Sequence, residues 1–78
     1  MIKENEMNPN QLAGQILRNL RHEYGLSQRA LAENVTLSGT SLCDRHYRRI
    51  EYGQMQPSVR LAMAICSALD SDVYEVWT

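Results

Sequence analysis

The stretch that decides the fold of this chain lies between Gly25 and Gly53. It begins Gly25-Leu-Ser-Gln-Arg-Ala-Leu-Ala-Glu33 and ends Tyr47-Arg-Arg-Ile-Glu-Tyr-Gly53, and Pro57-Ser58 follows shortly after. Apolar residues in both segments recur three or four positions apart, which is the spacing of one face of a helix. The glycines supply the backbone freedom that ends a helix. This stretch therefore predicts two short helices that meet at an angle.

The second of these helices is rich in arginine. Tyr47 and Ile50 mark its buried side. Arg45, Arg48 and Arg49 fall away from that side, because residues three and four apart share a helix face. A cationic ridge of this kind, backed by a small core, suits a DNA groove.

The charge of the chain is unevenly distributed. The 78 residues carry a net charge of −1, which by itself argues against a nucleic-acid partner. From Arg18 to Arg60, however, seven arginines stand against four acidic residues, a local +3, whereas the two ends hold one lysine and five acidic residues, or −4. This segregation lets one face approach phosphates. An ordinary solvated surface is the alternative, but the planar guanidinium of arginine suits paired contacts to phosphate or guanine.

The ordered set Gly-Leu-Ser-Gln-x-x-Leu-Ala, Arg-Ile-Glu-x-Gly, Pro-Ser and Ala-Leu resembles the phage repressor/Cro-type (XRE) helix-turn-helix family. The match covers roughly Leu17 to Val76. The resemblance implies an all-α, five-helix Cro/repressor-like domain, and residues 36–41 add an extended turn between the second and third helices. It also implies a sequence-specific double-stranded DNA-binding transcriptional regulator of bacterial or phage type, and not an enzyme.

The resemblance also assigns roles to individual residues. Base edges in the major groove would be read by Asp44, Arg45, His46 and Arg49. Phosphates would be contacted by Gln28, Arg48, Tyr52, Gln54 and Met55, the last three from the loop after the recognition helix. Arg21 and Glu51 would form an ion pair that orients this helix.

Two of these roles have alternatives. Asp44 either accepts a hydrogen bond from a cytosine amine or orients Arg45 or Arg48 on the same helix. His46 fits a surface side chain as well as a base reader. Arg45 and Arg49 are the stronger candidates for base contacts, because arginine can bond guanine with two donors.

An insertion separates this chain from the family pattern. Thr36–Ser41 stand where the family has a turn of about one residue. Cys43 matches the family's helix-cap position but lacks a good oxygen acceptor, whereas Ser41 has one and puts Asp44 in the first turn. We therefore expect Ser41 to cap a recognition helix spanning about 42–52. The hydroxyls of the insert, that of Ser41 among them, either contact phosphates or belong to a passive loop.

The rest of the chain reads as flanking elements of one domain. Residues 1–8 are expected to form a flexible N-terminal arm, and residues 9–78 the helix-turn-helix domain. Asn8 can cap the first helix, with proline at the first helical position. Ser58 can open a fourth helix, and Asp72 can cap a short final one.

The expected partners are a double-stranded DNA operator and a second copy of the chain, since a two-fold pair can read a palindrome. Trp77 is expected at the core edge or at the subunit contact. No apolar run approaches the length of a membrane span, so a cytoplasmic location is expected, and no small-molecule ligand is evident. Cys43 and Cys66 are expected to be buried free thiols. Their spacing from His22 and His46 matches no ligand pattern, so neither metal nor cofactor is expected.

The competing interpretation is a protein-interaction module, or an antitoxin-like partner-binding protein, on the same helix-turn-helix scaffold. A steep loss of duplex binding with added salt would favour the DNA-binding interpretation. Salt-insensitive association with a protein would favour the alternative.

Overall fold

Five helices make up the part of the chain that the computed structural model describes, residues 8–77. They are α1 (Pro9–Glu23), α2 (Gln28–Leu37), α3 (Asp44–Glu51), α4 (Val59–Ala68) and α5 (Val73–Val76). No strand occurs between residues 8 and 77. The all-α, five-helix fold expected from the sequence is therefore confirmed. Apart from Asn8, the arm expected for residues 1–8 lies outside the described residues.

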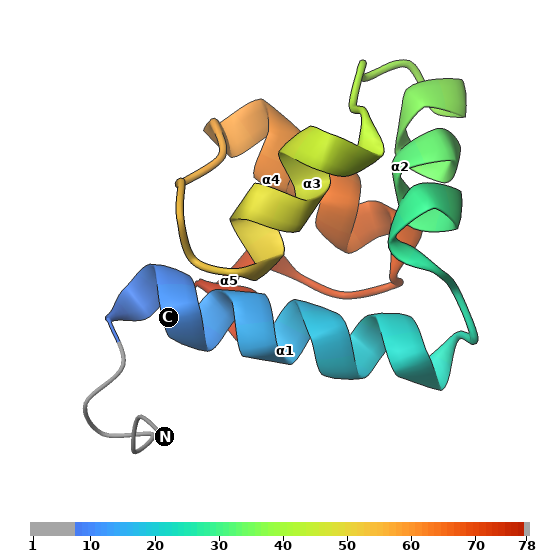
Figure 1. Ribbon diagram of the computed structural model, residues 1–78. Coiled ribbons are helices and arrows are strands. Elements are labelled where there is room, and N and C mark those ends of the chain that lie inside the picture. Colours follow the sequence, from blue (N-terminus) through green and yellow to red (C-terminus); the bar gives the residue numbers. More distant parts are fainter. Residues whose placement is uncertain (1–7, 78) are drawn as a thin grey trace.

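Helix α3 lies at the front of the molecule in Figure 1, with α1 below it, α2 beside it and α4 behind it. Contacts join α3 to both α1 and α2, whereas α4 contacts α2 and α5, and α5 returns to α1. Helix α3 is thus held from two sides. Its remaining side is open to solvent.

Side-chain caps set most helix starts, as the sequence predicts. At α1 the Asn8 side chain accepts from the Gln11 amide at 2.8 Å, and the Gln11 side chain accepts from the Asn8 amide at 3.2 Å. Ser27, Ser58 and Asp72 each accept a hydrogen bond from an amide in the first turn of α2, α4 and α5, respectively. These bonds satisfy amides that have no partner within the helix.

The start of α3 differs from the expected one. The helix begins at Asp44, and its cap is Cys43, whose sulfur accepts a hydrogen bond of 3.4 Å from an amide of the first turn. Ser41 is not the cap and stands exposed in the preceding loop. The cause is Thr36, whose Oγ1 accepts from the Leu42 amide at 3.0 Å and donates to the Leu42 carbonyl at 2.8 Å. Because both backbone groups of Leu42 are bonded to this hydroxyl, Leu42 cannot serve as the first residue of α3.

Part of the insert continues α2. This helix ends at Leu37, inside the Thr36–Ser41 insert, so the insert lengthens α2 and leaves the amino end of α3 unextended. Gly39 in the remaining loop has a φ of 114°, a conformation that side chains disfavour. The helix expected at about 42–52 consequently spans Asp44–Glu51.

Buried apolar side chains from all five helices, and from Leu42, form one core. They are Ala13, Leu17, Leu31, Ala32, Val35, Leu42, Tyr47, Ile50, Leu61, Ile65, Cys66, Leu69 and Val76. Cys66 is buried as expected, but Cys43 is exposed, because its position as a helix cap keeps it outside the core. Trp77 packs partly buried against the core edge.

Close contact between α1 and α3 depends on Gly14. A Cβ atom at this position would collide with the carbonyl oxygen of Glu51 and would stand 2.7 Å from its carbonyl carbon. Glycine thus lets the two helix backbones approach more closely than any side chain would allow. The carboxyl end of α3 is fixed on α1 by this contact.

Candidate nucleic-acid interface

The two sides of α3 have opposite characters. Tyr47, Ile50 and Glu51 are buried, whereas Arg45, Arg48 and Arg49 are exposed, as the helical spacing predicts. Packing of the apolar side against the core fixes the rotation of the helix about its axis. The arginines must therefore point away from the protein.

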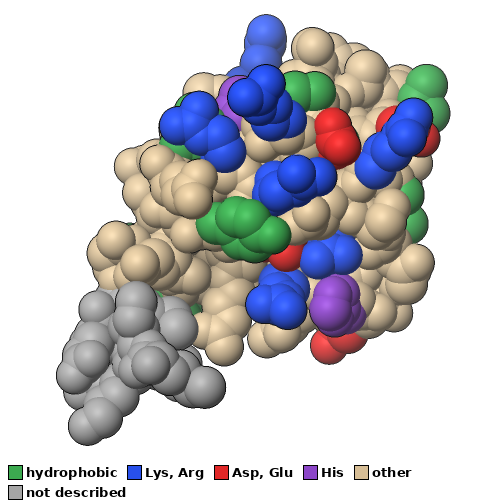
Figure 2. All heavy atoms as spheres, viewed as in Figure 1, with side chains coloured by type: hydrophobic (Ala, Val, Ile, Leu, Met, Phe, Trp, Pro, Cys, Tyr) green, Lys and Arg blue, Asp and Glu red, His purple; other side chains and the backbone are tan. Residues whose placement is uncertain are grey.

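Cationic side chains extend beyond α3 over the same face of the molecule. Figure 2 shows Lys and Arg side chains spread over the side on which α3 lies, with Asp and Glu side chains between some of them. Exposed arginines also occur on α1, at Arg18, and on α2, at Arg29. Such a surface raises the local concentration of anions despite the net charge of −1.

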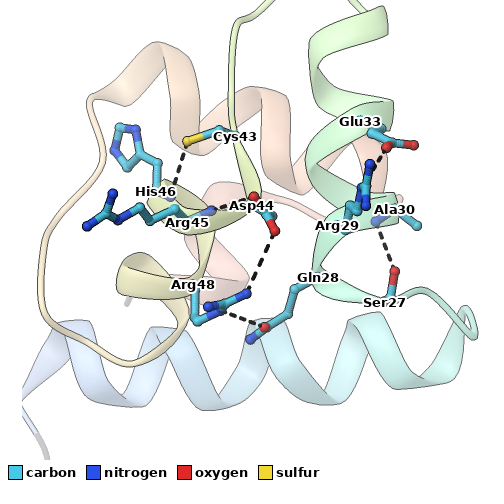
Figure 3. Close-up of polar contacts among 10 residues, drawn as sticks. All are labelled: Ser27, Gln28, Arg29, Ala30, Glu33, Cys43, Asp44, Arg45, His46 and Arg48. Atoms are coloured by element: carbon cyan, nitrogen blue, oxygen red, sulfur yellow. Dashed lines mark hydrogen bonds and ion pairs between the residues drawn. The ribbon is translucent and has the colours of Figure 1, made fainter.

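Arg45 and Arg49 are free to contact a ligand, since neither forms an ion pair with another residue in 8–77. Together with Cys43, His46 and Met55 they line an open hollow of about 200 Å³. In Figure 3 the Arg45 side chain extends outward from α3, and His46 lies beside it. Three of the four residues expected to read bases thus share one surface region.

Asp44, the fourth, is differently placed. Its Oδ1 accepts from the Arg45 amide at 3.0 Å, and its Oδ2 lies 3.7 Å from Nη2 of Arg48. Arg48 in turn donates from Nε to Oε1 of Gln28 at 3.2 Å. Of the two partners considered for Asp44 on its own helix, the arginine that its carboxylate pairs with is Arg48 (Figure 3).

Arg21 and Glu51 form a buried, doubly bonded ion pair between α1 and α3. Nε and Nη2 of Arg21 donate to the two carboxylate oxygens of Glu51 at 3.0 and 2.9 Å. Nη1 of Arg21 donates to the Leu26 carbonyl at 2.8 Å, which ties the turn before α2 to the same group. Planar, bidentate geometry of this kind fixes orientation as well as distance.

The pKa values of the pair reflect this geometry. Burial by itself would raise the pKa of Glu51, but the hydrogen bonds and the positive charge of Arg21, together with smaller contributions from other neighbours, outweigh it, and the pKa lies below its usual value. The hydrogen bonds that Arg21 donates to the Glu51 carboxylate raise the pKa of Arg21 despite its burial. Both groups are therefore charged at neutral pH. Nearby, the hydroxyl of the fully buried Tyr47 has no hydrogen-bond partner in the described part of the chain, and burial raises its pKa.

A polar hollow of about 310 Å³ lies where the end of α1, the start of α2 and the end of α3 meet. Its lining is Arg18, Arg21, His22, Ser27, Gln28, Glu51 and Tyr52. The positive end of the α2 dipole points into this region, and anions are favoured there. The sequence led us to expect phosphate contacts from Gln28 and Tyr52 but not from Arg18 or His22. Arg18 and His22 stand four residues apart on the polar side of α1, and this spacing is the signal that could have found them.

Two of the three loop residues expected to contact phosphate have backbone amides that are already bonded. The amides of Tyr52 and Gln54 donate to the carbonyls of Arg48 and Arg49, at 3.0 and 2.9 Å, and so close the end of α3. Any phosphate contact from these two residues must come from their side chains, which are exposed. The amide of Met55 donates to no atom of residues 8–77.

Some hydroxyls of the insert are likewise bonded within the protein, and one is not. Thr36 is bonded to Leu42, and Ser38 Oγ donates to the Val35 carbonyl at 2.7 Å. These two hydroxyls hold the loop in place. Ser41 has no such bond within the described residues and stays available for an external contact.

Two further findings bear on the site. No group of His, Cys, Asp and Glu side chains in residues 8–77 is arranged to hold a metal ion. None of the helices within this range is long and apolar enough to cross a membrane.

The arrangement of α2 and α3, joined by a turn and held against α1 and α4, defines a helix-turn-helix domain. Two crystal structures of ClgR from Corynebacterium glutamicum, described as a clp gene regulator, have a similar fold. One has a TM-score of 0.78 at 27% identity and covers 91% of this chain and 70% of its own. The other has a TM-score of 0.76 at 27% identity and covers 91% of this chain and 86% of its own. No family model and no curated protein matches the sequence.

Proposed function

We propose that this protein is a sequence-specific, double-stranded DNA-binding transcriptional regulator of bacterial or phage type, and not an enzyme. The observation that carries the proposal is the exposed arginine side of α3, which the core and the Arg21–Glu51 ion pair hold in one orientation. The likeness to ClgR, a gene regulator, supports the same assignment. The family resembled by the sequence, the Cro/repressor-type XRE family, is part of this proposal.

Sequence would be read from α3 in the major groove. Arg45 and Arg49 are proposed to contact base edges, because they are exposed, unpaired within the described chain and able to bond guanine with two donors. His46 and Asp44 lie on the same helix and would meet neighbouring bases. Each bidentate contact between an arginine and guanine discriminates against a wrong base by about 1–3 kcal/mol.

Phosphate contacts would hold this helix in register. We assign them to Gln28, Ser41, Arg48, Tyr52, Gln54 and Met55. Arg18 and His22 are added to this set because they line the polar hollow at the start of α2. Contacts to phosphate position a protein and carry no direct sequence information. Loss of a phosphate contact should therefore, by itself, weaken binding to all duplexes alike.

Selection of bound sequences from a random duplex pool, followed by fluorescence anisotropy at several salt concentrations, tests this function. We expect one preferred sequence and a steep fall in affinity with salt. Arg45→Ala or Arg49→Ala should each relax the preference at one base pair. Arg60→Ala removes an exposed arginine from α4 and should leave the preferred sequence unchanged. Identical preferences in the wild type and in both α3 variants would refute the assignment.

We also propose that the protein acts as a homodimer. A single eight-residue helix in one half-site buries little surface, whereas a two-fold pair reads two half-sites. Large apolar side chains stay exposed on α4 and α5, with Val59 75%, Met63 58% and Tyr74 82% exposed. Aromatic and methionine side chains are enriched at such interfaces. Sedimentation velocity of the wild type and of Tyr74→Glu tests this: a monomeric wild type would exclude it.

A partner-binding module, including an antitoxin-like protein, is the second candidate. It is favoured by an open hollow of about 370 Å³ beside the 85% exposed Leu37, where α2 meets the loop before α3. Association with a protein that is insensitive to salt, together with no binding to any duplex, would replace the DNA-binding proposal with this one.

A further inference from the structure

Arg48 is held by partners on two different helices. Its Nε donates to Gln28 at 3.2 Å, and its Nη2 lies 3.7 Å from Oδ2 of Asp44. Gln28 is the first residue of α2 and Asp44 is the first residue of α3. Figure 3 shows the guanidinium lying in the space between the two helices. We call these three side chains the Gln28–Arg48–Asp44 triad.

Both carboxylate oxygens of Asp44 have a neighbour that competes with an external ligand. One oxygen accepts from the Arg45 amide, and the other lies 3.7 Å from Arg48. A carboxylate can accept from a cytosine amine, and its charge repels phosphate. Arg48 offsets that charge and faces the oxygen that has no hydrogen bond. Arg48 therefore weakens Asp44 as an acceptor for cytosine, although lone pairs stay free on both oxygens.

The triad restricts Gln28 in the same manner. A free glutamine side chain can both accept from and donate to adenine. Here the oxygen of Gln28 accepts from Arg48, so one of its two lone pairs is occupied, whereas its amino group, a donor, stays free. With the triad intact, the acceptors at this end of the helix pair are partly occupied by Arg48.

The triad should contribute little to the folding stability of the free protein. The Arg48 and Asp44 side chains are 48% and 45% exposed, and an ion pair this exposed is screened by solvent. A bound DNA groove displaces that water and strengthens the electrostatic interactions of the triad. Its effect should therefore appear in binding preference and not in folding.

We infer that Arg48 determines which base Asp44 and Gln28 favour, as a positioning residue, in addition to any phosphate contact of its own. This inference rests on the proposed DNA-binding function. Loss of Arg48 frees one acceptor on each partner. The preferred base pair at that position should then shift toward one that presents an amine, cytosine or adenine.

The test is selection from a random duplex pool, carried out with wild type, Arg48→Ala, Asp44→Asn and the double variant. Arg48→Ala should change the preference at one base pair by at least about fivefold and also lower overall affinity. In the Asp44→Asn background the same substitution should change that preference by clearly less, because no carboxylate charge remains to be uncovered and only the Gln28 oxygen is freed.

Arg29→Ala is the matched control. Arg29 is also an exposed arginine in an ion pair, with Glu33 at 3.2 Å, but both members of that ion pair belong to α2. The Arg29→Ala substitution should leave the preferred sequence unchanged. Arg48→Gln repeats the measurement with a side chain of similar length, and thermal melts of all variants check that they are folded.

The outcomes separate the two proposals. A uniform loss of affinity in Arg48→Ala, with the preferred sequence intact, would overturn the positioning role and leave the proposed function in place. Failure of the wild type to bind any duplex would overturn both. A preference that shifts equally in the presence and absence of the Asp44 carboxylate would also exclude the triad as the cause.

Discussion

Removing one partner of the Arg21–Glu51 ion pair should be far more damaging than removing both. The two side chains are 9% and 2% exposed, so either one would be left as an isolated buried charge. Such a loss costs about 3–5 kcal/mol, whereas replacing a whole buried pair with apolar residues is often neutral or stabilising. A chain of 78 residues has a total unfolding free energy of only about 4–12 kcal/mol. Glu51→Met or Arg21→Met alone should thus bring the protein close to unfolding.

The free energy of unfolding of Arg21→Met should depend on pH in the direction opposite to that expected from the Glu51 carboxylate in the wild type. In the wild type the pKa of Glu51 is lowered, so its contribution to stability is present above the pKa of the unfolded chain and is lost as pH falls through the folded pKa. In Arg21→Met, burial without a cation should raise that pKa, so stability should fall as pH rises from about 5 to 7. The wild type should be nearly flat over the same window.

Urea denaturation of the wild type, both single variants and Arg21→Met/Glu51→Met at pH 5 and 7 measures these effects. The double variant should be more stable than either single variant. Single costs below about 1 kcal/mol, as for an exposed pair, would refute the argument from burial. So would a double variant whose cost equals the sum of the two single costs.

Three further outcomes follow from the packing. Gly14→Ala should lower the melting temperature by at least about 4 °C despite the higher helix propensity of alanine, because its Cβ would meet the backbone of Glu51; an unchanged temperature would mean that α1 and α3 can separate freely. Tyr47→Phe should be neutral or stabilising, since the buried hydroxyl has no partner in the described residues; a loss above about 1 kcal/mol in urea denaturation would reveal a hydrogen bond. At pH 8 a thiol reagent should modify the exposed Cys43 quickly and Cys66 only on unfolding, because burial, then nearby acidic groups, raises the pKa of Cys66 to about 11; equal rates would contradict its burial.

The features that could be predicted from the sequence are local ones. Asn8, Ser27 and Ser58 cap their helices through amides three residues away, so the pattern of a few neighbouring residues is enough. The arginine side of α3 follows from helical spacing alone. The buried Arg21–Glu51 pair was expected only through the family resemblance, since thirty positions separate its partners.

The start of α3 could not be predicted because a distant hydroxyl competes for the backbone. Local capping chemistry favours Ser41 over Cys43, but Thr36 lies six positions from Leu42 and bonds both of its backbone groups. The Arg48 contact with Gln28 spans twenty positions and depends on how α2 and α3 cross. Gly14 gave a usable signal, a glycine on the apolar side of a long helix, which indicates a close backbone contact but does not name the partner.

Because of the Thr36 hydroxyl, the position of α3 does not depend on the length of the loop before it. Since two hydrogen bonds join Leu42 to α2, residues 38–41 form a loop whose two ends are already fixed. Lengthening such a loop costs only about 0.6 kcal/mol for each doubling of its length. A short peptide or a dye-labelled residue can therefore be inserted between Thr40 and Ser41 without displacing the arginines, and it would report from the edge of the surface that we propose meets DNA.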